Sequence, residues 1–281
     1  MSFYLGIDGG GTRCRARLRD GTGALIGEAE GDMANIHQDF TRALNSILAV
    51  ARAVAGAVPL EKIHTGLGLA GATGREQCAR VETADLPFAS VRCDSDGYIA
   101  CRGAHQGGDG GIVIAGTGSA GLALVEGQRL SIGGHGFALG DQGSGAVIGR
   151  ALVQRALLAH DGIVPHSRIT ADIMAHFRNT PAAVIEWSRI ALSRDYAAFA
   201  PLAFAAAEAG DGEALAILRE AAQALANIAR RLRSAGALRL CLIGGLGAAI
   251  APYLSADIAA SFHPPLAEPV EGAIWLARSQ T

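Results

Sequence analysis

One structural pattern occurs twice in this sequence, about a hundred residues apart. In its first copy, an apolar run over residues 4–8 ends at Asp8, and after a glycine turn apolar residues alternate with Arg13, Arg15 and Arg17. Alternation of this kind is typical of a β-strand with one buried face. A third run, residues 24–30, follows the turn at 20–23. Short strands joined by glycine-rich turns predict an antiparallel meander.

The second copy follows the same plan between residues 111 and 132. Its three runs are 111–115, 120–125 and 129–132, and the turn between the first two again contains glycines and a threonine. A chain of 281 residues is long enough for two domains with substantial cores. Two copies of one meander therefore predict two domains of similar architecture.

Between the meanders the pattern changes to alternating helices and strands, which is typical of parallel strands joined by crossover helices. In the first half the predicted helices are 40–57, 75–84 and 97–105, and the predicted strands are 63–69 and 90–93. In the second half we expect helices at 145–160, several between 169 and 235, a strand at 238–243, and helices at 248–261 and 268–278. The glycine run 107–111 is expected to be a hinge.

Composition narrows the classes of function. Half of the residues are apolar, 18% are charged and the net charge is -2, which favours a compact globular protein and gives no general electrostatic reason to bind nucleic acid or an anionic membrane. Apolar stretches are interrupted by arginines, and the first residues read as a strand, so we expect a cytoplasmic protein with no membrane span. Five cysteines without a Cys-x-x-Cys pair favour reduced thiols over disulfides or a metal cluster.

Both meanders carry a turn suited to phosphate. In the first, three glycines expose backbone amides, Asp8 at the strand end can bind magnesium directly or through water, and Thr12 can donate its hydroxyl to a phosphate. The second turn, Gly116–Ser119, stands at the corresponding place. An ordinary glycine hairpin explains either turn alone, but the two together would hold a polyphosphate from both sides.

Two common nucleotide sites do not fit. A Gly-x-x-x-x-Gly-Lys-Ser/Thr loop is absent from the sequence, and Lys62 is its one lysine. A dinucleotide site fits poorly, because the glycines here join two strands rather than a strand and a helix.

Three further segments carry polar chemistry. Asp94 follows the strand at 90–93 and can accept the proton of an attacking hydroxyl, although Asp96 competes for that role and can equally cap the next helix. The glycine loop around His135 and the run 140–144 suit a sugar pocket, unless His135 is a plain loop residue. The turn 244–247 links a buried strand to a helix, with or without a ligand. The arginines of residues 13–17 and those of the amphipathic stretch 219–233 are predicted to be solvated.

These features, with Leu69–Ala72, resemble the N-acetylglucosamine kinase and glucosamine kinase branch of the BadF/BadG/BcrA/BcrD-type ATPases, in the actin-like superfamily. The resemblance extends from Gly6 to residues 271–273. It implies an α/β fold of two ribonuclease H-like domains with an interdomain cleft, each a mixed five-stranded sheet flanked by helices. The domains implied are 1–108, completed by helix 268–279, and 109–267.

The resemblance also assigns roles to residues. It selects Asp94 as the catalytic base, leaves Asp96 as a helix cap, and puts magnesium at Asp8, through water. ATP is expected at Gly10, Gly11, Thr12, Gly116, Thr117 and Gly118, with Gly245 against the adenosine. Sugar contacts are expected at Asn35, Asp94, Ser119, Gly134, His135, Gly136 and Asp141.

The implied reaction is ATP-dependent phosphorylation of the 6-hydroxyl of a small amino sugar, giving glucosamine 6-phosphate and ADP from glucosamine. Animal-type N-acetylglucosamine kinases have Gly-Trp-Gly where this chain has Gly134-His135-Gly136, which favours the free amine. N-acetylglucosamine stays open as the alternative substrate, and an activator ATPase of a radical dehydratase or reductase is the alternative of another class. A homodimer is also left open.

Overall fold

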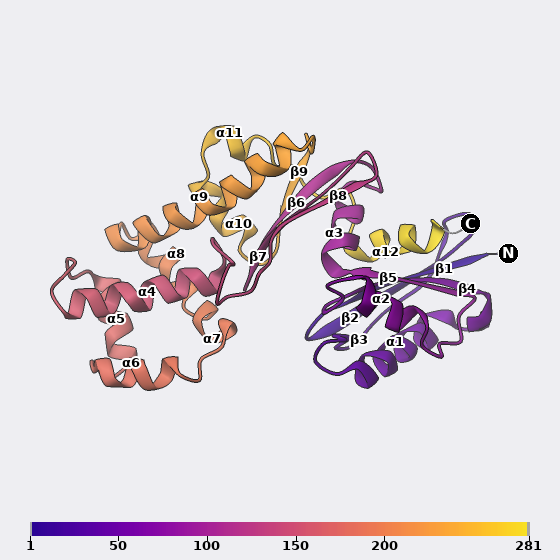
Figure 1. The fold of residues 1–281 in the computed structure, drawn as a ribbon, viewed down its shortest axis with the longest axis horizontal. Helices are drawn as coiled ribbons and strands as arrows, with labels where there is room; N and C mark the ends of the chain where they lie inside the picture. Colours follow the sequence, from indigo (N-terminus) through magenta and orange to yellow (C-terminus); the bar gives the residue numbers. More distant parts are fainter. Residues whose placement is uncertain (1, 280–281) are drawn as a thin grey trace. The chain divides into compact units, whose positions relative to one another are not determined.

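The computed structural model describes residues 2–279, which form two compact units (Figure 1). The first unit contains the chain up to Gly110 together with the segment from Pro264 onward, and the second is Gly111–His263. The boundaries expected from the sequence lay at 108 and 268. The end of the chain thus returns to the unit in which the chain began.

The first unit is built on a five-stranded sheet of order β3-β2-β1-β4-β5. The first three strands form the antiparallel meander that the sequence predicts, and β4 and β5 extend the sheet in parallel to β1. The sheet is therefore mixed, as expected. Its strands are β1 (Phe3–Gly9), β2 (Arg13–Asp20), β3 (Leu25–Asp32), β4 (Ile63–Leu69) and β5 (Ser90–Ser95).

Helices cover both faces of this sheet. On one face, α1 (Phe40–Ala55) buries Ile47 and Val50 against Leu5, Ile7 and other apolar residues of the strands. The opposite face carries α3 (Asp96–Ala104) and α12 (Pro269–Arg278), which is yellow in Figure 1. The remaining elements are the 3-10 turn Leu60–Lys62 and α2 (Arg75–Glu82), which packs beside β5.

Glycines allow α12 to approach the sheet closely. A β-carbon on Gly6 would lie 2.3 Å from the carbonyl oxygen of Val270, and one on Gly66 would lie 2.0 Å from that of Ala273. Such distances do not occur between real atoms, so no other residue fits there without moving the helix. Because α12 packs backbone against backbone, it is an integral layer of the first unit.

The second unit has a sheet of order β8-β7-β6-β9. The expectation of a fifth strand is wrong for the described residues, since a single parallel bridge between Leu240 and Phe262 stands at the edge of β9. After Phe262 the amide of His263 still donates to the carbonyl of Leu240, but Pro264 and Pro265 come next, and because proline cannot donate a ladder hydrogen bond the pairing ends there. The strands are β6 (Gly110–Ala115), β7 (Ser119–Val125), β8 (Gln128–Gly133) and β9 (Leu240–Ile243).

Six helices between β8 and β9 supply most of the core of the second unit. The longest, α9, buries an alanine- and leucine-rich stripe, while Arg219, Arg230, Arg231 and Arg233 remain exposed as predicted. The six are α4 (Gly145–His160), α5 (Arg168–His176), α6 (Pro181–Ser188), α7 (Ser193–Ala197), α8 (Ala200–Glu208) and α9 (Gly212–Ser234).

The single helix expected at 248–261 is wrong. The chain instead forms α10 (Gly247–Ile250), a 3-10 turn over Ala251–Tyr253, and α11 (Ala256–Ala259). Pro252 lacks the amide that a continuing helix needs, and the chain is extended at Leu254 and Ser255.

Within residues 2–279, no helix has the length and apolar character needed to cross a membrane. All five cysteines are free thiols.

Candidate active site

The first of the two glycine turns predicted to bind phosphate joins β1 to β2. The amide of Gly10 donates to the carbonyl of Arg13 at 2.9 Å, and the carbonyl of Gly10 accepts from Ala34 at 3.0 Å. Gly11 and Thr12 are exposed, and a β-carbon on Gly11 would meet only the side-chain nitrogen of Asn35, at 3.9 Å. The turn is thus fixed at its base and open at its tip, which suits a ligand that needs close approach to the backbone.

Asn35 lies beside this turn because its own loop is tied to β4. It forms a parallel bridge with Ala70, and its side-chain oxygen accepts from the amides of His37 at 3.0 Å and Gln38 at 3.2 Å. The oxygen is occupied by the loop, so the amide nitrogen is the group of Asn35 that faces the turn.

The strand register aligns the two carboxylates predicted to act in catalysis. Asp8 pairs with Gly68, and Gly68 pairs with Asp94, so the three residues form one row across β1, β4 and β5. Residues in one row point to the same face of a sheet. Gly68 contributes no side chain, and Ile99 of α3 fills its place, 2.2 Å from where a β-carbon would be.

The environment of Asp8 disfavours its charged form. Burial and the neighbouring Asp96 raise the pKa of Asp8 to about 6, against the lowering effect of Arg15 and Arg13. Arg15 stands directly opposite Asp8 in the β1–β2 ladder. A partly buried carboxylate whose charge is incompletely compensated is a suitable ligand for a cation.

Asp94 is fixed by the start of the next helix. Its Oδ1 accepts from the amide of Ser95 at 2.7 Å and from the hydroxyl of Ser95 at 3.3 Å. The hydroxyl of Ser95 also accepts from the amide of Tyr98, so Ser95 is the N-cap of α3. The expectation that Asp96 caps this helix is wrong: Asp96 is the first helical residue, and its carboxylate accepts from the amide of Gly97.

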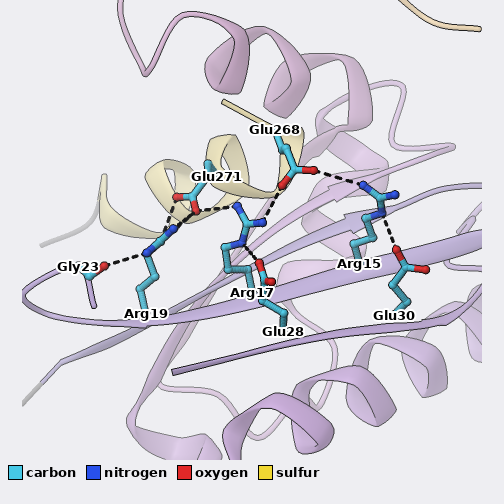
Figure 2. Close-up of polar contacts among 8 residues, drawn as sticks. All are labelled: Arg15, Arg17, Arg19, Gly23, Glu28, Glu30, Glu268 and Glu271. Atoms are coloured by element: carbon cyan, nitrogen blue, oxygen red, sulfur yellow. Dashed lines mark hydrogen bonds and ion pairs between the residues drawn. The ribbon is translucent and has the colours of Figure 1, made fainter. Parts of the chain in front are cut away.

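Two of the three β2 arginines predicted to be solvated, Arg15 and Arg17, are paired and partly covered, whereas Arg13 is 60% exposed as predicted. Arg17 pairs with Glu271 at 2.9 Å and with Glu268 at 2.6 Å, both at the start of α12, and Arg19 also binds Glu271 (Figure 2). The side chains of Arg17 and Glu271 are only 17% and 14% exposed. The prediction failed because these partners lie some 250 residues away along the chain and the spacing of the arginines carries no trace of them.

The same network reaches the row of Asp8. Arg15 pairs with Glu30 on β3 at 2.9 Å and with Glu268 on α12 at 3.5 Å (Figure 2). The sequence pattern predicts no role for Arg15 at the site. Its position opposite Asp8 follows from the register of the β1–β2 hairpin, which residue alternation alone does not fix.

In the second unit, two glycine turns follow neighbouring parallel strands. The turn Gly116–Gly118 comes after β6 and packs on the start of α4, where the amide of Gly145 donates to the carbonyl of Gly116 at 2.8 Å. The turn after β9 is joined to the first by a 2.9 Å bond from the amide of Leu246 to the carbonyl of Ala115. Gly245, on this second turn, is exposed, and a β-carbon added to it would have nothing within 4 Å.

Asp141 lies against the same turn. It is 9% exposed, has a positive φ of 62°, and accepts from the amide of Ser119 at 3.4 Å. A β-carbon on Gly118 would come within 3.0 Å of its carboxylate. The hydroxyl of Ser119 is buried and donates to the carbonyl of Gln142 at 2.8 Å, which supports the loop that carries Asp141.

The loop of residues 133–140 stands next to Asp141. Gly133, Gly134 and Gly136 have positive φ angles, and the amide of Gly134 donates to the carbonyl of Ser119 at 3.1 Å. His135 is exposed, with its β-carbon packed against Gly140.

The predicted residues therefore form one group in each unit. Asp8, Gly10, Gly11, Thr12, Asn35 and Asp94 gather at one end of the first sheet, and Gly116, Thr117, Gly118, Ser119, Gly134, His135, Gly136, Asp141 and Gly245 gather in the second unit. Across residues 2–279, no three His, Cys, Asp or Glu side chains lie together as a metal site. Magnesium fits this arrangement, because it commonly binds one or two carboxylates and takes its other ligands from water and phosphate.

Known proteins resemble this chain over most or nearly all of its length. A curated relative, the glucosamine kinase GspK of Vibrio cholerae, is 40% identical over 99% of this chain and 96% of its own. An N-acetyl-D-glucosamine kinase of Dictyostelium discoideum is 29% identical over 79% of this chain and 76% of its own. Among solved structures, a candidate N-acetylglucosamine kinase from Chromobacterium violaceum superposes with a TM-score of 0.88 at 33% identity, covering 99% of both chains.

A sequence model of a protein family also matches this chain. The model of the BadF/BadG/BcrA/BcrD ATPase family matches residues 5–277, which span both glycine turns, the whole second unit and all but the last residue of α12. The chain therefore belongs to the BadF/BadG/BcrA/BcrD ATPase family.

Proposed function

We propose that this protein is an ATP-dependent amino-sugar kinase that phosphorylates the 6-hydroxyl of glucosamine, giving glucosamine 6-phosphate and ADP. The observation that carries the proposal is the row in which Asp8 and Asp94 flank Gly68 beside the first phosphate turn. Such a row provides a carboxylate for a metal and a second one for a hydroxyl, as phosphoryl transfer requires. The full-length similarity to a glucosamine kinase supports the choice of reaction.

Asp94 is the proposed catalytic base. The two donors on its Oδ1 come from one residue, Ser95, and hold the carboxylate in one orientation at the end of β5. From there it accepts the proton of the 6-hydroxyl as the sugar oxygen attacks the γ-phosphorus. Asn35, on the same side of the unit, contributes its amide nitrogen to the sugar.

Asp8 is the proposed magnesium ligand, through water. When bound, magnesium neutralises charge on the phosphates of ATP. The turn of Gly10, Gly11 and Thr12 receives phosphate in the first unit: Gly10 fixes its base, and Gly11 and Thr12 form its open tip. Gly116, Thr117 and Gly118 receive phosphate in the second unit. The adenosine is proposed to lie against Gly245, because the space beside this residue is open: a β-carbon added there would have no atom within 4 Å.

The sugar contacts proposed for the second unit come from Asp141 and the loop before it. Asp141 offers a buried acceptor that takes a long, 3.4 Å hydrogen bond from the amide of Ser119, and Gly134, His135 and Gly136 border it. Ser119 acts on the sugar through the loop that its hydroxyl supports.

N-acetylglucosamine is the second candidate substrate. The similarity to N-acetylglucosamine kinases of 29% and 33% identity favours it, whereas His135 in place of a tryptophan favours the free amine. The two sugars differ by one acetyl group, and a small change in the 133–140 loop decides between them.

A coupled assay of ADP release tests the proposal. Glucosamine, N-acetylglucosamine, glucose and N-acetylmannosamine are each supplied with ATP and magnesium. We expect the highest kcat/KM with glucosamine. A higher kcat/KM with N-acetylglucosamine would make that sugar the preferred substrate in place of glucosamine. If no sugar stimulates ADP release, the protein is not a kinase of these sugars.

A further inference from the structure

The loop of residues 133–140 is anchored by an aromatic side chain. Three of its glycines have positive φ angles, and His135, Ala138 and Leu139 are exposed, Leu139 at 84%. Its internal hydrogen bonds, from the amides of Leu139 and Gly140 to the carbonyl of Gly136, close a turn without attaching it to a helix. Among the non-glycine residues of the loop, Phe137 alone is partly buried.

Phe137 has partners on two helices. Its ring lies 5.0 Å from that of Tyr196 on α7, measured between centroids, and the guanidinium carbon of Arg150 on α4 lies 4.7 Å from its centroid. Arg150 also donates from Nη1 to the carbonyl oxygen of Phe137 at 3.4 Å. One arginine thus contacts both the ring and the backbone of the same loop residue.

The two partners are themselves fixed. A β-carbon on Gly149, the residue before Arg150, would lie 1.8 Å from the carbonyl oxygen of Tyr196, so α7 packs directly on α4 at this point. On its other side, the ring of Tyr196 meets Trp187 edge to face at 4.6 Å, and Trp187 continues into the aromatic cluster with Phe177 and Phe199. The loop is therefore attached to a rigid part of the second unit.

We propose that Arg150 and Tyr196 are positioning residues for sugar binding, which act by holding Phe137 and thereby the glycine loop 133–140. A loop this rich in glycine has many accessible conformations, and each must be given up when a sugar binds. Holding Phe137 removes much of that freedom beforehand, which strengthens binding through preorganisation. The inference rests on the proposed function, because it takes the loop to contact the sugar.

The test replaces Arg150 by methionine, which keeps an unbranched apolar side chain but removes the cation and the donor. We expect KM for glucosamine to rise by about tenfold, from the lost cation–π contact and hydrogen bond, with KM for ATP unchanged within about twofold. Arg150→Lys should recover part of the loss, since lysine keeps a charge and donors. Phe137→Leu should raise KM for the sugar as Arg150→Met does.

Arg155→Gln is the matched control. Arg155 lies on the same helix but pairs with Glu213 and Glu220, so its loss should leave KM for the sugar unchanged. A second readout is independent of turnover: hydrogen exchange at the amides of Gly134, Leu139 and Gly140 should be faster in Arg150→Met and unchanged in Arg155→Gln.

Either of two results would overturn the inference: an Arg150→Met enzyme with wild-type KM for sugar, or one in which KM for ATP rises as much as KM for sugar. Unchanged exchange at the loop amides would overturn it as well. Failure of the proposed function looks different, because the wild-type enzyme itself would then show no sugar-stimulated ADP release.

Discussion

Asp8 and Asp94 stand two strands apart in a single row of the first sheet, and Gly68 is the residue between them. Because strand register fixes this row, the separation of the two carboxylates is set by the backbone rather than by flexible side chains. Because Gly68 has no side chain, no third side chain of the sheet stands between the two carboxylates. The side chain of Ile99, from α3, packs over Gly68 instead.

Replacing Asp94 by asparagine should abolish turnover while leaving the site able to bind. Asparagine keeps the shape and can still accept from Ser95, but it cannot take up a proton. We expect kcat to fall by about 10²- to 10⁴-fold, with dissociation constants for glucosamine and ADP, measured by calorimetry, changed by less than about threefold. Near-normal turnover in this variant would remove Asp94 from the mechanism.

Asp96→Asn is the control for that experiment, since it removes a carboxylate two residues further along, at an exposed position on α3. Turnover should stay close to that of the wild type. A collapse of kcat in Asp96→Asn with an active Asp94→Asn would reverse the two roles.

At neutral pH, Asp8→Asn should raise the free energy of unfolding of the unliganded protein. The same substitution should abolish enzymatic activity. The pKa of Asp8 is about 6 in the folded protein, above the ordinary value of 3.8, so folding penalises the charged form. The penalty is absent below pH about 4, grows between pH about 4 and about 6, and above that stays constant at no more than about 3 kcal/mol. The measurement is the free energy of unfolding of both proteins from pH 4 to 8, in the absence of magnesium. A difference that does not grow with pH would contradict this account of Asp8.

Gly245→Ala separates binding from folding. Gly245 has an ordinary φ and open space around it, so the protein itself gives no reason for glycine there. If the adenosine lies against it, alanine should raise KM for ATP by about fivefold or more, roughly 1 kcal/mol, with the melting temperature unchanged. Gly212→Ala, also in open space but at the start of α9, is the control and should leave KM for ATP as it was. Equal KM values in the two variants would exclude Gly245 from the nucleotide site.

Glu271→Gln should weaken the first unit at neutral pH. Burial acts to raise the pKa of Glu271, but the hydrogen bonds from Arg19 and Arg17 outweigh it and leave the pKa lowered. A lowered pKa contributes stability above the ordinary value of 4.5 that is lost as the pH falls through the folded-state value. We expect a loss of about 1–3 kcal/mol at pH 7, measured by urea unfolding, and a smaller one at acid pH.

The comparison for Glu271 is Glu30→Gln. Glu30 pairs with Arg15, but its side chain is 57% exposed, so its removal should cost less than about 1 kcal/mol. Equal losses in the two variants would argue against a special role of α12 in covering these arginines.

Local sequence patterns predict much of the architecture. The meanders, the parallel strand β4 and helix α1 follow from residue alternation, apolar periodicity and glycine turns, and the sequence predicts them to within a few residues. The same reasoning predicts Asp94 at a strand end, and in the structure it is the second-last residue of β5. These elements are predictable because each depends on neighbours within a few positions of the chain.

What the sequence did not reveal depends on distant partners. The alternation of arginines on β2 is the same whether water or α12 covers them, and only the fold brings Glu268 and Glu271 to that face. Likewise, Phe137 reads as one apolar residue in a glycine loop until Tyr196 and Arg150 are seen around it. The missing fifth strand of the second unit follows from Pro264 and Pro265, whose effect on pairing depends on where the sheet edge falls.

The return of α12 to the first unit has a consequence for biosynthesis. Residues 111–263 make up the second unit and can fold as soon as they emerge from the ribosome. The first unit is made earlier but must wait, with Gly6 and Gly66 uncovered, until α12 is released. Its N-terminal sheet therefore lacks one of its layers until α12 has been made, and removal of α12 should harm the part of the protein that was synthesised before the second unit.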